Sequence, residues 1–127
     1  MGRDAMIVAG FGYRAAATAE SLRDALTRAS DGRRVDRLAA PRDKAAAPCL
    51  TALACELGLS VLPIDADTLL RPDTPTQAPR VLQARGTGSV AEASALAGAG
   101  PGARLLCQRQ ISCDRLATCA LAEGETP

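Results

Sequence analysis

The chain has 127 residues, 47% of them hydrophobic, which suits a single globular domain over 1–127. Its 15 basic and 14 acidic residues nearly balance and only 2% of residues are aromatic, so it lacks the basic stripe and stacking rings of a nucleic-acid-binding protein. No apolar run approaches the roughly 18 residues of a membrane span, and the first is too short for a signal peptide, so we expect a cytoplasmic protein.

The first predicted elements are a strand, a turn and a helix. Residues 5–9 form a short apolar run without alternation, typical of a strand buried on both faces. The glycines that follow predict a turn over 10–14. Thr18 suits a helix N-cap, and apolar residues continue at helical spacing until Ser30-Asp31-Gly32 ends the helix.

Two more strands and a helix follow. Residues 35–40 predict a second strand that Pro41 closes, and Pro48 suits the first turn of a helix that ends at Gly58. Residues 59–64 predict a third short strand. This alternation of strands and helices favours a largely parallel sheet with right-handed crossovers.

The last part of the chain is predicted to add helices and an antiparallel strand pair. Loop residues at 71–79 overlap the start of a short helix at 77–84, and a second glycine turn covers 86–88. Ser89 and Glu92 match a capping box for a helix that reaches Gly98. Strands at 104–109 and 115–122 should pair antiparallel, and the tail at 123–127 should fray.

The two glycine turns are candidate anion sites. Gly10-x-Gly12-x-x-Ala15 stands between a strand and a helix, as in a dinucleotide-binding turn, but no acidic residue ends the second strand to hold a ribose. The second turn, Gly86-Thr87-Gly88-Ser89, lacks the lysine and spacing of a P-loop. Its amides and hydroxyls could hold carboxylates, or it could simply cap a helix.

Cysteine and histidine counts argue against a metal site, and we expect no cofactor. The sequence has no histidine, and its odd number of cysteines contains no CxxC pair, so we expect neither a zinc site nor an imidazole base. We interpret the cysteines as reduced thiols that pack as small apolar residues. They are Cys49, Cys55, Cys107, Cys113 and Cys119.

In an open α/β sheet, ligands gather outside the carboxyl ends of the strands. Both glycine turns could meet there with the loop that carries Lys44, the one lysine of the sequence. The two aromatic residues, Phe11 and Tyr13, could either plug the edge of the core or flank a flat ligand.

Four stretches of the chain, taken in order, resemble the CobE family and the C-terminal domain of CbiG proteins. They are VAGFGYRAAATAESL (8–22), LAAPRDKAAAPCLTALACELGL (38–59), TPTQAPRVLQARGTGSVAEASAL (74–96) and the closing strands LLCQRQ and LATCALA. The third is the most specific. The chain departs from the family pattern at Tyr13, where Cys is frequent, and at Arg109, where lysine is usual.

The resemblance implies a three-layer α/β/α sandwich with a mixed, largely parallel sheet of about five strands. It also implies work on precorrin-type tetrapyrroles around the steps that contract the macrocycle in cobalamin biosynthesis, a branch of porphyrin metabolism. Full-length CbiG opens a lactone on the cobalt-containing ring and releases a two-carbon fragment. The resemblance covers only the C-terminal domain of CbiG, so we do not expect that activity to carry over directly.

Two functional hypotheses remain open beside the dinucleotide alternative. The chain could bind and escort a carboxylated precorrin or corrinoid, with other corrin-pathway enzymes as protein partners and neither nucleic acid nor membrane involved. Alternatively, it could be a hydrolytic enzyme with Lys44 as its catalytic acid or imine-forming amine. The candidate ligand-binding residues are Gly10, Gly12, Tyr13, Arg14, Lys44, Gly86, Thr87, Gly88, Ser89 and Arg109.

Overall fold

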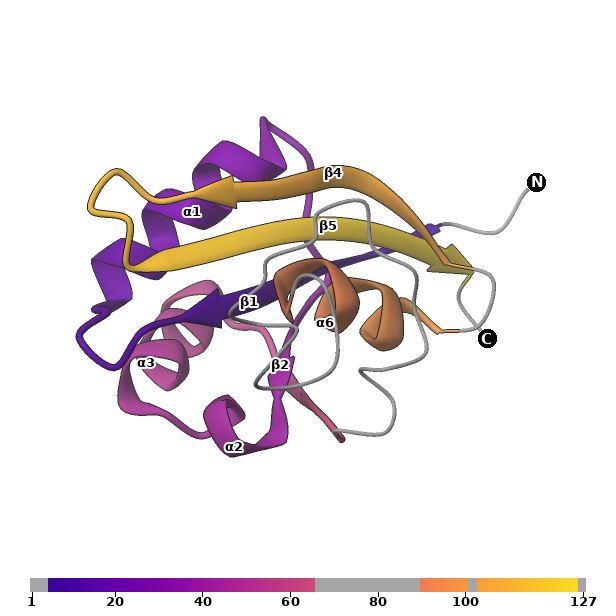
Figure 1. The fold of residues 1–127 in the computed structure, drawn as a ribbon. Coiled ribbons are helices and arrows are strands. Elements are labelled where there is room, and N and C mark those ends of the chain that lie inside the picture. Colours follow the sequence, from indigo (N-terminus) through magenta and orange to yellow (C-terminus); the bar gives the residue numbers. More distant parts are fainter. Residues whose placement is uncertain (1–4, 66–89, 101–102, 126–127) are drawn as a thin grey trace.

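The structure, a computed structural model, describes residues 5–65, 90–100 and 103–125 and has an α/β fold (Figure 1). Its five-stranded sheet has the strand order β3-β2-β1-β5-β4. The strands are β1 (Ala5–Tyr13), β2 (Arg37–Pro41), β3 (Val61–Ile64), β4 (Arg104–Ile111) and β5 (Ala117–Glu125).

The sheet is mixed and largely parallel, as the sequence predicts. β1 pairs parallel with β2, and β2 pairs parallel with β3. β5 is antiparallel to both β1 and β4, so β4 runs in the same direction as the first three strands. Four of the five strands therefore end at one edge of the sheet, which we call the carboxyl edge.

Helices cover both faces of the sheet, which confirms the three layers (Figure 1). One face packs against α1 (Ala19–Ser30) and α3 (Pro48–Leu57), and the other packs against α6 (Val90–Ala99). The first interface holds the bulkier core, and the second is built mainly from alanine. The largest buried side chains on the α1–α3 side are Phe11, Leu22, Leu38, Leu50, Leu53 and Leu121.

The predicted helix ends are confirmed where the structure describes them. The Thr18 hydroxyl accepts a hydrogen bond from the amide of Ser21 at 3.2 Å and caps α1. α1 ends at Asp31, which is left-handed with φ 47°. Gly58 ends α3 with φ 69°, a conformation that glycine adopts without a Cβ clash.

The predicted turn over 10–14 is wrong, because β1 continues through both glycines to Tyr13. The reason is the close approach of α6. A Cβ at position 10 would lie 2.2 Å from the carbonyl oxygen of Ala91 and 2.3 Å from the amide nitrogen of Ala95. Gly10 therefore lets helix and strand backbones touch, a use of strand glycine that the same sequence signal also permits.

Other differences concern short segments. α2 (Arg42–Ala45) is a one-turn helix that the sequence analysis did not predict, and it carries Lys44. The predicted fraying of residues 123–125 is wrong, because β5 pairs with β1 as far as Glu125. The predicted helix at 77–84 and the turn at 86–89 lie outside the described residues. Within the described ranges, no helix is long and apolar enough to cross a membrane.

We predict that Gly10→Ala will lower the free energy of unfolding by about 3 kcal/mol, because the clash is with helix backbone that cannot move alone. Gly12→Ala is the matched control. Its Cβ would meet the Thr118 side chain at 3.0 Å and should cost about 1 kcal/mol. Urea denaturation of both variants measures the difference, and equal stabilities would contradict the packing account.

Candidate functional site

Lys44 and Tyr13 meet at the carboxyl edge, where the neighbouring strands β1 and β2 end. The Lys44 ammonium donates a hydrogen bond to the Tyr13 carbonyl oxygen at 2.8 Å, and the Tyr13 hydroxyl donates one to the Lys44 carbonyl oxygen. The Lys44 Nζ also lies 4.9 Å from the centroid of the Tyr13 ring. We call this reciprocal contact the Tyr13–Lys44 clasp.

The clasp fixes the chemistry of both side chains. Partial burial, with smaller contributions from Cys49 and Asp43, raises the pKa of Tyr13 to about 12, so its hydroxyl stays protonated and donates. A carbonyl oxygen and an aromatic face are both partners that suit a cation. Lys44 is therefore held in one place as a positively charged donor.

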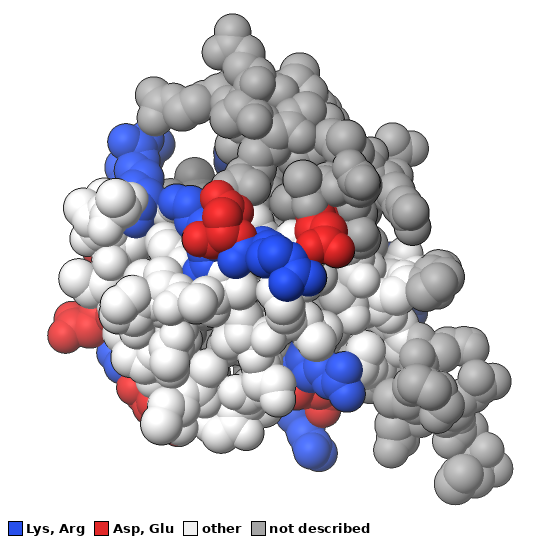
Figure 2. Space-filling view, turned by 90° about the horizontal axis from the view of Figure 1, so that it is seen from below, with Lys and Arg blue, Asp and Glu red and all other residues white. Residues whose placement is uncertain are grey.

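Arg14 and Lys44 differ from Arg42, which also follows β2 at this edge and pairs with Asp65. Within the described residues, no ion pair joins Arg14 or Lys44 to an acidic side chain, and Arg14 is exposed. Basic and acidic side chains adjoin one another on the face on the side of α2, which Figure 2 shows. The ion pairs are Arg23–Glu56, Arg28–Asp24, Arg34–Asp36, Arg42–Asp65 and Arg104–Glu123.

Arg109 lies apart from the clasp. It is in β4, and two strands, β1 and β5, separate β4 from the strand that precedes Lys44. Three strand spacings correspond to roughly 14 Å. The Arg109 amide donates to a carboxylate oxygen of Glu92 at 3.0 Å, so this buried glutamate connects α6 to β4.

The other predicted site residues are not brought to the clasp. Gly10 is buried beneath α6, and the backbone contact there accounts for the glycine without a ligand. Phe11 is fully buried in the core, which confirms that it plugs the core. Residues 86–89 lie outside the described ranges, so their ligand-binding role stays a prediction, as does that of Gly10 and Gly12.

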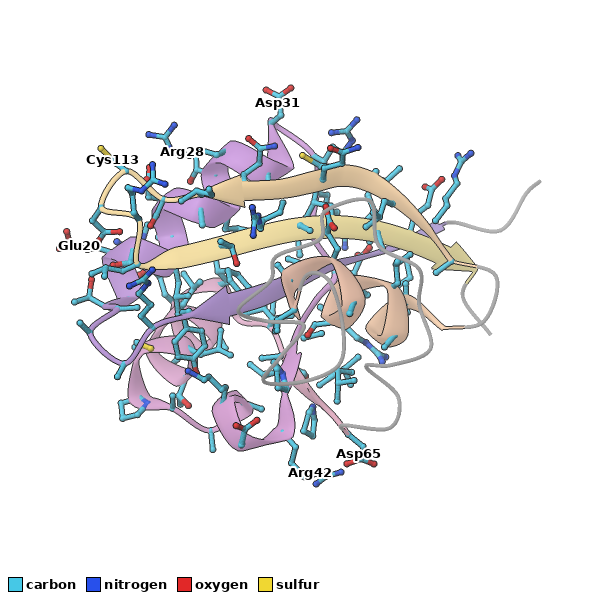
Figure 3. All side chains as sticks on the ribbon, in the orientation of Figure 1. Glu20, Arg28, Asp31, Arg42, Asp65 and Cys113 are labelled. Carbon is cyan, nitrogen blue, oxygen red and sulfur yellow. The ribbon has the colours of Figure 1, made fainter. Side chains whose placement is uncertain are left out.

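A hydrogen-bond network that the sequence did not signal organises the turn between β4 and β5. One Asp114 carboxylate oxygen accepts from the Ser21 hydroxyl at 2.5 Å, and the other accepts from the Ser112 hydroxyl at 2.5 Å and the Leu116 amide at 3.1 Å. The amide of Cys113 donates to Asp24 at 2.6 Å. Figure 3 shows Cys113 and Glu20 at this end of the molecule.

The cysteines of the described residues are all free thiols, with Cys119 fully buried. Burial, followed by the nearby Cys107 thiol, raises the pKa of Cys119 well above its ordinary value, so this thiol stays protonated. Within residues 5–65, 90–100 and 103–125, no group of three His, Cys, Asp or Glu side chains gathers closely enough to hold a metal ion.

Comparison with known proteins gives a consistent result. The family model described as "Cobalamin synthesis G C-terminus" matches residues 7–122. The chain is 34% identical to CobE, a protein from the cobalamin (vitamin B12) biosynthetic pathway, with a TM-score of 0.84 over 97% of this chain and 93% of CobE. No curated protein matches the sequence.

Two further solved structures share the fold. The cobalamin biosynthesis protein chiG from Agrobacterium tumefaciens is 31% identical, with a TM-score of 0.73 over 95% of this chain and 100% of chiG. A cobalamin biosynthesis protein G homologue from Sulfolobus solfataricus is 20% identical, with a TM-score of 0.68. The match covers 94% of this chain but only 37% of the Sulfolobus solfataricus protein, so the similarity concerns the fold of one part of that protein.

We predict that Tyr13→Phe will lower the free energy of unfolding by about 1 kcal/mol, because it removes the hydrogen bond to the Lys44 carbonyl oxygen. Tyr13→Leu should lower it further, since the cation–π contact is lost as well. Urea denaturation tests the ranking. If Tyr13→Phe is as stable as the parent protein, the hydroxyl does not stabilise the clasp.

We also predict that stability will fall as the pH drops below about 4. Hydrogen bonds from Ser112, Ser21 and the Leu116 amide lower the pKa of Asp114, and those from Cys113 and Arg28 lower the pKa of Asp24. Lowered pKa values stabilise the fold above the unfolded-state pKa, and this stabilisation disappears as the pH falls through the folded-state pKa.

Thermal unfolding between pH 2 and pH 6 measures this acid effect. Asp114→Asn should be less stable at pH 6 and should lose less of its stability on acidification than the parent protein does. An identical pH dependence in the two proteins would show that Asp114 does not contribute.

Proposed function

Because this chain belongs to the Cobalamin synthesis G C-terminus family and is thus a protein of the cobalamin biosynthesis pathway, we propose that it binds a precorrin-type tetrapyrrole around ring contraction. In this proposal it acts as an intermediate-binding, or escort, protein. Precorrins are flat and carry several carboxylates, so recognition calls for cations fixed at an accessible edge.

The observation that carries the proposal is the Tyr13–Lys44 clasp beside Arg14, which has no ion-pair partner among the described residues. The ammonium of Lys44 is held at the carboxyl edge by the Tyr13 carbonyl oxygen and ring, and none of the ion pairs among the described residues includes it. Arg14 follows Tyr13 directly in the chain, and its side chain is exposed. These two cations supply donors for a ligand carboxylate, and that of Lys44 is held in place by the clasp.

The same geometry bears on the enzymatic alternative, in which Lys44 forms an imine during hydrolytic release of a two-carbon fragment. An attacking amine must be unprotonated and free of its contacts. In the clasp the Lys44 nitrogen instead contacts a carbonyl oxygen and a ring, and Glu92, the buried carboxylate on the α6 side, accepts a hydrogen bond from the Arg109 amide. These contacts support binding over covalent catalysis. No specific observation favours dinucleotide binding.

We predict that Lys44→Met will weaken binding of hydrogenobyrinic acid, a stable carboxylated corrinoid, by about tenfold. Lys44→Arg keeps the charge and should stay within about threefold of the parent protein. The visible absorbance of the corrinoid on titration measures both. Arg33→Asn, which removes an exposed charge at the opposite edge of the sheet, is the control and should bind normally.

The two functional hypotheses give different results in a trapping experiment. If Lys44 forms an imine, borohydride treatment with a precorrin-type substrate leaves a mass adduct on that residue, and Lys44→Arg abolishes turnover. Absence of saturable binding by the parent protein, or equal affinity in Lys44→Met, would contradict the escort proposal.

A further inference from the structure

We infer that Arg115, which no sequence motif signalled, is a third ligand-binding cation at the carboxyl edge. Together with Lys44 and Arg14 it forms what we call the cation row. This inference rests on the proposed function and extends it. The row would bind two or more carboxylates that project from the same side of one tetrapyrrole.

Backbone contacts place the three residues next to one another. The Lys44 ammonium contacts the carbonyl of Tyr13, the residue that precedes Arg14. The Arg14 amide donates to the Leu116 carbonyl oxygen at 2.9 Å, and Leu116 follows Arg115 directly. Ladder spacing puts the Cα atoms of Arg14 and Arg115 about 6 Å apart. The row thus crosses the ends of β2, β1 and β5, which are neighbours in the sheet.

The two arginines of the row have no carboxylate partner among the described residues. Both are exposed, and no ion pair joins either to a carboxylate of the described residues. Asp114 precedes Arg115, but its two oxygens accept from Ser21, Ser112 and Leu116. Glu20 lies at the same end of the molecule as Cys113 (Figure 3), and no ion pair among the described residues joins it to either arginine. Adjacent like charges repel, and an anion between them removes that repulsion.

The backbone at Arg115 gives an independent reason to look for a function of its side chain. Arg115 has φ 63°, and only one other non-glycine residue in the described ranges, Asp31, is left-handed. Glycine, asparagine and aspartate adopt this conformation more readily than arginine does. Asp114, the preceding residue, accepts hydrogen bonds from Ser21 and Ser112, which help to hold the turn in this conformation.

The ligand chemistry follows from the spacing. Neighbouring strands lie about 4.8 Å apart, so the backbone positions that carry the three cations lie side by side at this edge. Carboxylates on adjacent positions of a flat macrocycle rim can contact several cations of the row at once, whereas a single carboxylate contacts only one of them. The inferred ligand is therefore a planar polycarboxylate.

The experiment compares Arg115→Asn with Arg33→Asn. Asparagine accepts the left-handed conformation, so Arg115→Asn should keep the melting temperature or raise it by up to about 3 °C. The same variant should bind hydrogenobyrinic acid about five- to tenfold more weakly, with a shallower salt dependence. Arg33→Asn makes the same change in net charge and should bind like the parent protein. A residue with only a structural role would show the reverse pattern, a lower melting temperature and unchanged affinity.

A second probe separates this inference from the proposed function. Mellitate, a benzene ring with six carboxylates, is titrated into ¹⁵N-labelled protein while the arginine Nε–H signals are followed. Shifts of the Arg14 and Arg115 signals would support the cation row even if hydrogenobyrinic acid does not bind. Failure of hydrogenobyrinic acid to bind would contradict only the escort proposal. Unmoved Arg14 and Arg115 signals, or hydrogenobyrinic acid affinity unaffected by Arg115→Asn, would overturn the inference while Lys44→Met still tests the proposed function.

Discussion

The contact between the backbones of α6 and β1 is the constraint on which the rest of the arrangement depends. It exists because position 10 has no Cβ, and Gly98 allows a similar approach toward Val8 and Ala39 further along the helix. The face beneath α6 is consequently filled by alanines rather than by bulky side chains. With its glycines committed to packing, this interface has little room for a ligand, and the exposed cations stand instead at the carboxyl edge.

Much of the fold could be predicted from the sequence because its signals are local. Apolar periodicity, the Thr18 cap and the Gly58 end each depend on a few adjacent residues, and each was predicted correctly. The glycines at 10 and 12 were misassigned to a turn because a glycine that turns the chain and one that admits a helix leave the same sequence signal. The α6 helix that decides between them begins some 80 residues later.

The candidate site was predictable only in part. Parallel neighbouring strands end together, so the sequence could indicate that Tyr13 and Lys44 approach one another, although not that each would bind the other's carbonyl oxygen. Arg115 was missed because nothing in Ser112-Cys113-Asp114-Arg115 marks the last residue as left-handed. Its conformation belongs to a turn held partly by Ser21, which is 93 residues from Asp114 in the chain.

The Tyr13–Lys44 clasp also has a consequence for the thermodynamics of recognition. A free lysine side chain loses about 2 kcal/mol of rotamer entropy when a ligand immobilises it. Here that loss occurs during folding, since the ammonium is already held by a carbonyl oxygen and a ring in the absence of ligand. A carboxylate that reaches Lys44 thus meets a donor whose direction is set in advance. Such a donor strengthens the binding of ligands whose acidic groups match its position and adds little binding free energy for ligands whose groups do not.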